Sequence, residues 1–190
     1  MLRNEAKIAI RFTLLTTVLL GILYPLAITA LGHTFLRTQA DGELIVSSGN
    51  VVGSSLIGQS FTSDVYFHGR PSAAGNGYDA TSSGGSNYAA SSQKLVARIE
   101  GDVAHYAAEN KSQPVPIDLV TASGSGLDPD ISPAAAMFQA ARVASARRLP
   151  LATVIDLVQR HVQKRQFGFL GEERVNVLLL NMDLDRLAHE

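Results

Sequence analysis

The chain contains no cysteine and has few charged residues. Without cysteine it has no disulfide framework, no thiolate metal ligand and no thiol nucleophile. Charged residues form only 17% of the 190 residues, against about 25% in an average soluble domain. Sixteen lysines and arginines face seventeen aspartates and glutamates, which excludes a nucleic-acid binder that relies on bulk positive charge. The hydrophobic share of 46% excludes intrinsic disorder.

Charge is missing altogether between Phe12 and Leu31. Twenty helical residues at about 1.5 Å each span about 30 Å, the thickness of a bilayer's hydrocarbon core. The alternative is a cleaved signal peptide, whose apolar run is about 7–15 residues and ends in a small-x-small site. This run is longer, and Ala27 and Ala30 are spaced wrongly for such a site. We therefore predict one uncleaved transmembrane helix over residues 12–31, in contact with the lipid bilayer.

The charges that flank this helix predict its orientation. Arg3, Lys7 and Arg11 precede it, whereas Arg37 is the one basic residue in the next fifteen. By the positive-inside rule the N-terminus is cytoplasmic. We expect residues 1–11 in the cytoplasm, a linker over 32–42 and a periplasmic domain over 43–190, all at the inner membrane of a bacterium.

Short apolar runs and capping signals predict the fold of the outer part. The fold class is an α+β (or α/β) domain with a small sheet and about three helices. The expected elements are a hairpin formed by Leu44–Val46 and Val51–Ile57, a helix from Ser91 or Ser92 to Asn110, a strand over Ile117–Thr121, helices over Pro133–Arg148 and from Pro150 to about Gln166, and a final strand over Val175–Leu184.

The sequence carries no catalytic or metal-binding motif that we can identify. It lacks G-x-S-x-G and the P-loop pattern, and its five histidines are scattered without ligand spacing. We therefore predict no catalytic residues and no metal ligands. A loop rich in glycine and serine could hold an anion with its backbone N–H groups, although an ordered loop held by its own hydrogen bonds or by a partner is the favoured interpretation. Its core is Ser83, Gly84, Gly85, Ser86 and Asn87.

Arginines in two places suggest contacts. Arg70 follows Tyr66, Phe67 and His68, where a guanidinium can stack on rings and bind a carboxylate. Tyr24 lies deep in the apolar helix and can face a partner helix. We propose Tyr66, Phe67, Arg70 and Tyr24 as partner-interface candidates. The second place is a basic cluster, expected to be a solvated helix face, which contains Arg142, Arg147, Arg148, Arg160, Lys164 and Arg165.

Several motifs, in order along nearly the whole chain, resemble the C subunit of the Kdp potassium-transporting P-type ATPase. Glu173 is a departure, because the family usually reads Gly-Glu-Pro-Arg there. The matching segments are Gly53–Gln59, Tyr66–Ala73, Tyr78-Asp79, Ser83–Asn87, Asp118–Thr121, Ser123–Pro129, Arg142–Ala144 and Gly171–Asn181.

The resemblance implies an inner-membrane complex with three partners: a potassium-channel-like subunit, an ATP-hydrolysing P-type subunit and a small membrane subunit. The family is described as stabilising this complex and as a catalytic chaperone that raises its ATP affinity. ATP is thus implied, with Gln59 and Ser83–Asn87 as nucleotide-contact candidates. However, residues 1–11 are too few to enclose a nucleotide, and the outer domain lacks a phosphate-binding lysine. We therefore expect no tightly bound cofactor and an indirect effect on ATP.

These observations lead to one main hypothesis and one alternative. The main hypothesis is a non-catalytic accessory subunit that stabilises an ATP-driven, high-affinity potassium uptake complex and modulates its ATP-hydrolysing subunit. The alternative is a stand-alone, membrane-anchored periplasmic ligand-binding domain.

Overall fold

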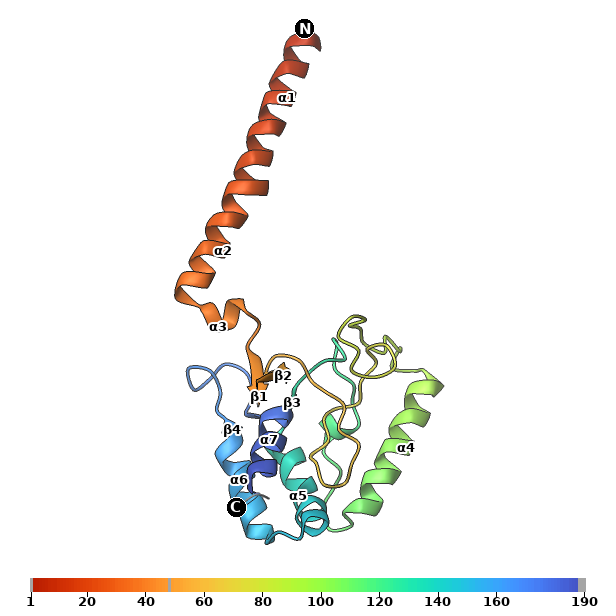
Figure 1. The fold of residues 1–190 in the computed structure, drawn as a ribbon. Helices are drawn as coiled ribbons and strands as arrows, with labels where there is room; N and C mark the ends of the chain where they lie inside the picture. The colour runs from red at the N-terminus through yellow and green to blue at the C-terminus, as the bar shows by residue number, and fades with distance from the viewer. Residues whose placement is uncertain (1, 48, 188–190) are drawn as a thin grey trace. The chain divides into compact units, whose positions relative to one another are not determined.

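Figure 1 shows the computed structural model, which describes residues 2–47 and 49–187. The chain divides into two compact units, residues 1–52 and 53–190. We call them the anchor unit and the outer unit.

A long apolar helix dominates the anchor unit. It consists of α1 (Leu2–Val18), a π-helical turn (Leu19–Leu23) and α2 (Tyr24–Phe35). Its 33 residues from Arg3 to Phe35 are long and apolar enough to cross a membrane, and the most apolar part is not buried by the protein. The predicted span over residues 12–31 lies inside this helix.

Pro25 explains the π-helical turn. Proline has no N–H, so the carbonyl of Gly21 loses the partner that an α-helix would give it. The helix widens just before this point, and the N–H of Tyr24 bonds to the carbonyl of Leu19, five residues back. A single wide turn of this kind is a common way to accommodate a disturbed ladder.

A short helix, α3 (Arg37–Ala40), and a hairpin follow. The hairpin pairs β1 (Leu44–Ser47) with β2 (Asn50–Ser54), as the sequence predicts. Gly49, at the turn, has a φ of +81°, a conformation that glycine adopts without steric cost. The second strand is shorter than predicted, because it ends at Ser54 rather than Ile57.

The outer unit has a three-stranded antiparallel sheet covered by helices, which confirms the α+β class. The strand order is β3 (Asp130–Ile131), β5 (Arg174–Asn176) and β4 (Val162–Gln163). Ile131 and Val162 both pair with Val175 of the central strand. Helices α5 (Pro133–Arg147), α6 (Leu151–His161) and α7 (Val177–Leu187) pack together beside the sheet (Figure 1). Helix α4 (Gln93–Glu109) contacts α5 near its C-terminal end, where the Tyr106 ring packs against Phe138.

A capping residue explains where the predicted helix α5 begins. The Ser132 hydroxyl accepts a hydrogen bond from the N–H of Ala135 at 3.0 Å, and Pro133 occupies the first turn of α5. This is the expected start of a helix. Arg148 ends α5 in a left-handed conformation with a φ of +58°. Helix α4 begins after Ser92 and ends before Asn110, as predicted.

The strand predicted over Ile117–Thr121 is wrong, because this segment turns on itself. Residues Ile117–Leu119 form a short 3₁₀ helix. The N–H of Leu119 bonds to the carbonyl of Pro116, and the Thr121 hydroxyl donates to the carbonyl of Ile117. The hydrogen bonds of this segment are therefore local turn bonds rather than ladder bonds to a neighbouring strand, although the segment contains β-branched residues.

The final strand predicted over Val175–Leu184 is also largely wrong. Only Arg174–Asn176 is a strand, and α7 follows immediately. The Asn176 side chain accepts from the N–H of Leu179 at 3.1 Å and so caps the helix. The buried residues Val177, Leu180, Asn181 and Leu184 have helical spacing, but a short continuous apolar run does not distinguish helix from strand.

Helix α6 is shorter than predicted. It ends at His161, and Val162 begins β4 instead of continuing the apolar stripe of the helix. The pairing of Val162 with Val175 replaces the helical hydrogen bonds there.

Candidate functional site

Residues Asp64–Arg70, which we call the threaded segment, form no helix or strand but cross the core beside α5 and α7. Two buried amides hold its centre. Asn181 accepts from the N–H of Phe67 at 2.8 Å and donates to its carbonyl at 2.9 Å. Gln139 does the same for His68, at 2.8 and 3.1 Å. Both amides are at most 1% exposed, so they replace the strand that would otherwise satisfy this buried backbone.

Two arginines of α5 hold the start of the threaded segment. Arg142 donates to the carbonyls of Asp64 and Tyr66, at 2.6 and 3.0 Å, and to the carboxylate of Glu109 at 2.8 Å. The Arg142 and Glu109 side chains are only 12% and 11% exposed. Five N–H donors in a planar fork allow one arginine to satisfy so many acceptors.

Arg147, about one and a half turns further along α5, also holds the threaded segment. It donates to the carbonyl of Val65 at 2.6 Å and to Asp185 at 2.6 Å, and its guanidinium lies 4.8 Å from the centre of the Tyr66 ring. The prediction of a solvated basic face is therefore wrong for Arg142 and Arg147. Both donate to carbonyls of the threaded segment, which lie 76 or more residues away in sequence.

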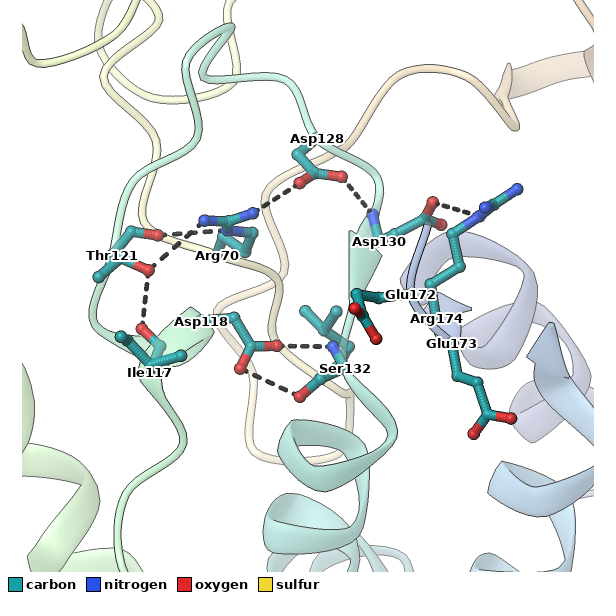
Figure 2. A pocket seen from close by; sticks show the side chains of 11 residues that line it. Arg70, Ile117, Asp118, Thr121, Asp128, Asp130, Ser132, Glu172, Glu173 and Arg174 are labelled. Atoms are coloured by element: carbon teal, nitrogen blue, oxygen red, sulfur yellow. Dashed lines mark hydrogen bonds and ion pairs between the residues drawn. The ribbon is translucent and has the colours of Figure 1, made fainter. Parts of the chain in front are cut away.

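Arg70 ends the threaded segment at the rim of an open pocket (Figure 2). It donates to Asp128 at 2.9 Å, and to the carbonyl and hydroxyl of Thr121 at 3.2 and 3.4 Å. The pocket has a volume of about 540 Å³. Arg70 thus binds a carboxylate, as expected, whereas the described cation–π contact with Tyr66 is made by Arg147.

The aspartates around this pocket are bound within the outer unit. Asp118 accepts from the N–H and hydroxyl of Ser132, at 2.6 and 3.1 Å. Asp130 pairs with Arg174 at 3.0 Å, and burial raises its pKa although Arg174 acts in the opposite direction. Asp128 also accepts from the N–H of Asp130, which closes the turn between them. Within residues 2–47 and 49–187, no group of three or more acidic or histidine side chains is placed to hold a metal ion.

Tyr78 also holds the end of the threaded segment. Its hydroxyl donates to the carbonyl of Arg70 at 2.6 Å. Burial, followed by the negative charge of Asp128, raises the pKa of Tyr78 to about 12. A Cβ at position 69 would lie 2.4 Å from this hydroxyl oxygen, so a larger residue there would require the Tyr78 side chain to shift.

The glycine- and serine-rich loop is tied to a second loop that ends at Asp128. Ser72 donates to the carbonyl of Gly126 at 2.6 Å. The hydroxyl of Ser83 and the N–H of Gly84 both donate to the carbonyl of Ser125, at 3.0 and 2.9 Å. Gly126 has a φ of +68°, and a Cβ there would lie 2.7 Å from backbone atoms of the neighbouring loop.

Ser83 and Gly84 are thus held by hydrogen bonds to the second loop. Gly85 lies close to the Gly124 carbonyl, where an added Cβ would approach to 3.0 Å, while Ser86 is half-buried and Asn87 is exposed. Gln59 lies instead against Gly53. The nucleotide-contact role of these residues stays a prediction.

Residues 6–186 match the KdpC family, described as "K+-transporting ATPase, c chain". The chain belongs to the KdpC family. Its relatives include a protein of Acidobacterium capsulatum, 53% identical over 97% of this chain and 99% of the relative. Another, from Koribacter versatilis, is 52% identical over 93% of this chain and 92% of the relative. A third, from Caulobacter vibrioides, is 55% identical over 90% and 87%. All three carry the name potassium-transporting ATPase KdpC subunit.

In this member of the KdpC family, the partner-interface candidates occupy different surroundings. Tyr24 is exposed on the apolar helix. Phe67 is fully buried in the hydrophobic core. Tyr66 is half-buried and donates to Asp185 at 3.2 Å. The involvement of these residues in a partner interface stays a prediction.

Sequence reasoning missed the groups that hold the threaded segment: Gln139, Arg142, Arg147 and Asn181. A signal exists for Gln139, which occupies the apolar stripe of its helix between Ala135 and Val143. A polar residue in such a stripe must find hydrogen bonds when it is buried. The sequence does not reveal which distant backbone supplies them.

Proposed function

We propose that this chain is a non-catalytic accessory subunit of an ATP-driven, high-affinity potassium uptake complex in the bacterial inner membrane. The observation that carries the proposal is the match to the KdpC family over residues 6–186. The apolar helix Arg3–Phe35 supports a membrane anchor. In the proposed topology the N-terminus is cytoplasmic and the outer unit is periplasmic, because three basic residues precede the predicted span.

The proposed partners are a potassium-channel-like subunit, an ATP-hydrolysing P-type subunit and a small membrane subunit. The chain's role is to stabilise their assembly. The internal bonding of the outer unit supports this role: its arginines and buried amides hold its own backbone, as at Arg142 and Asn181. Such a domain acts as a rigid body that contacts partners through its surface.

Any effect on ATP affinity is proposed to be indirect. The hydroxyl of Ser83 and the N–H of Gly84 already bond to Ser125, so an anion would have to displace these bonds. Contacts with the partner subunits would instead shift their conformational equilibrium, a coupling typically worth about 1–3 kcal/mol.

The decisive experiment tests growth and assembly together. In a strain that lacks this gene but keeps its partner genes, growth at limiting potassium should require the full-length chain. The chain should also co-purify with a tagged ATP-hydrolysing subunit. Normal growth without it, together with no co-purification, would refute the proposal.

Topology is tested with single cysteines, for which the cysteine-free chain is suited. A membrane-impermeant thiol reagent should label Ser92→Cys but not Asn4→Cys in intact cells. The reverse pattern would place the outer unit in the cytoplasm and reopen direct contact with ATP.

Calorimetry of the full-length chain in detergent micelles, with ATP and magnesium, tests the indirect effect. We expect no saturable binding at micromolar concentrations. A micromolar site that Gln59→Ala or Ser86→Ala abolishes would establish direct contact instead.

The open pocket of about 540 Å³ beside Arg70 favours a second candidate, a stand-alone ligand-binding domain. This alternative requires no partner subunits. It would be supported if the chain purified alone under conditions in which the partner subunits assemble without it.

A further inference from the structure

The connection between β4 and β5 exposes large apolar side chains at its tip. We call residues Arg165–Gly171 the aromatic tip. Phe167 is 87% exposed, Phe169 71% and Leu170 47%. Single exposed apolar residues are common on protein surfaces, but a group of neighbouring ones marks a surface that another molecule covers.

The aromatic tip is ordered by its own backbone. Gln166 and Leu170 pair as an antiparallel bridge, with both N–H···O distances at 2.9 Å. Between them the N–H of Gly168 donates to Arg165 at 3.1 Å, and that of Phe169 donates to Gln166 at 3.2 Å. These bonds fix the turn that carries the two rings before any partner binds, which reduces the entropy lost on binding.

The charges at the base of the aromatic tip do not suit a lipid surface. Arg165 is paired with Glu172, and the opposite charges of Lys164 and Glu173, which are both exposed, balance each other. Segments that bind anionic lipid heads carry clusters of unpaired lysine and arginine next to their apolar residues. A nearly neutral base with two aromatic anchors instead resembles the centre of a protein interface, where aromatic residues are enriched and charge is depleted.

The chain's path keeps the aromatic tip within reach of membrane proteins. The outer unit begins at Gly53, and the carbonyl of Ser55 accepts from the Asn176 side chain at 2.8 Å. Asn176 follows Leu170 by six residues, so at most about 20 Å of chain separates the tip from this hydrogen bond. Residues 36–52 separate Gly53 from the apolar helix and extend at most about 60 Å. Such a tether gives even a small contact a high effective concentration.

We propose that the aromatic tip docks into an apolar groove on the outer surface of a membrane-embedded partner subunit. Phe167 and Phe169 are the main anchors in this contact, and Leu170 adds apolar contact beside them. This inference rests on the proposed function, because it requires the assembly that the proposed function describes.

Thiol protection tests the docking directly. Phe169→Cys is labelled with a maleimide in three preparations: the chain alone in detergent, the chain alone in phospholipid vesicles, and the assembled complex in detergent. We expect labelling to be at least about tenfold slower in the complex alone. Leu151→Cys is the matched control, because Leu151 is also exposed in the outer unit and lies outside the pocket beside Arg70, and its labelling should be the same in all three.

Each outcome of this experiment decides one question. Rapid labelling of Phe169→Cys in an assembled complex refutes the docking but leaves the proposed function intact. Slow labelling already in vesicles shows that the tip meets lipid and also refutes the proposal. Failure of the unsubstituted chain to co-purify with its partners refutes the proposed function itself. As a second variant, F167S/F169S should lower the amount of chain recovered in the complex by at least about tenfold, and unchanged recovery would contradict the anchor role.

Discussion

The threaded segment and the aromatic tip are both irregular in backbone, yet they treat their aromatic residues in opposite ways. The threaded segment buries Phe67 completely and receives its hydrogen bonds from helices far along the chain. The aromatic tip bonds mainly to itself and leaves Phe167 and Phe169 in solvent. Irregular structure therefore serves two purposes here. Where distant side chains satisfy the backbone it builds the core, and where the backbone satisfies itself it displays residues for contact.

Removing the buried arginine should damage the threaded segment most. Arg142→Met leaves Glu109 buried without its cation and leaves two carbonyls without a donor, so we expect a loss of about 3–5 kcal/mol in the free energy of unfolding. Thermal or denaturant unfolding of the full-length chain in detergent measures it. The control is Arg160→Met, since Arg160 pairs with Asp156 on an exposed helix face, where such a pair contributes about 0–1 kcal/mol. Equal losses of unfolding free energy in the two variants would show that the buried arginine contributes no more to stability than the surface arginine.

The second-largest loss of stability is expected when the buried amide of Asn181 is removed. Asn181→Ala removes both hydrogen bonds to the Phe67 backbone, which costs about 2–4 kcal/mol because the donor and the acceptor stay buried. Asn76→Ala, at an exposed loop position, should change the free energy of unfolding by less than about 0.5 kcal/mol. A loss below about 1 kcal/mol for Asn181→Ala would show that water replaces the side chain.

Two glycines at the contact between the loops provide a matched pair of variants. Gly126→Ala should destabilise by about 1–3 kcal/mol, because the residue has a positive φ and its Cβ would meet Ala74 and Gly84. Gly124→Ala, two residues earlier, meets nothing within 4 Å. Urea unfolding midpoints should therefore separate the two variants, and similar midpoints would mean that the loops are not held together as described.

Acid should weaken the threaded segment through His68. Burial, followed by the positive charge of Arg142, lowers the pKa of His68 below its ordinary 6.5. The folded state then binds the proton less tightly than the unfolded chain, so stability is lost as the pH falls below that ordinary value. The unfolding midpoint should fall between about pH 7 and about pH 5, and His68→Gln should reduce this fall. An identical pH profile in the variant would remove His68 from the explanation.

The aromatic tip should show the smallest effect on stability. Phe169→Ser removes an exposed ring, so the free energy of unfolding should change by no more than about 0.5 kcal/mol. Circular dichroism during thermal unfolding measures this. A loss of several kcal/mol would mean that the ring packs within the domain, and the contrast between the two regions would disappear.

The fold could be predicted best where local signals decide it. The start of α5 follows from Ser132 and Pro133, and the hairpin follows from two apolar runs around Gly49. The failures occurred where contacts of individual side chains, which the apolar pattern does not reveal, decided the structure. The run from Val177 to Leu184 reads equally as strand or helix, and the Asn176 cap that settles it is visible only as one side chain among many.

The candidate site was harder to predict for the same reason. Arg142 and Arg147 look like a surface charge cluster in sequence, and only the folded chain shows their carbonyl partners at Asp64 and Val65. Phe67 looked like a contact residue because its neighbours are polar or aromatic, although the structure places it in the core. By contrast, the pairing of Arg70 with a carboxylate followed from its chemistry alone.

The bond between Asn181 and Phe67 joins residues 114 positions apart, and this separation has a kinetic consequence. Synthesis from the N-terminus delivers the threaded segment long before α7 exists to satisfy it. Until then its backbone must stay hydrated, and the ordering of the loop must wait for a contact of high sequence separation, which is slow to form. The outer unit therefore completes its core only after α7 has been made, and until then its apolar residues stay exposed to solvent and prone to aggregation.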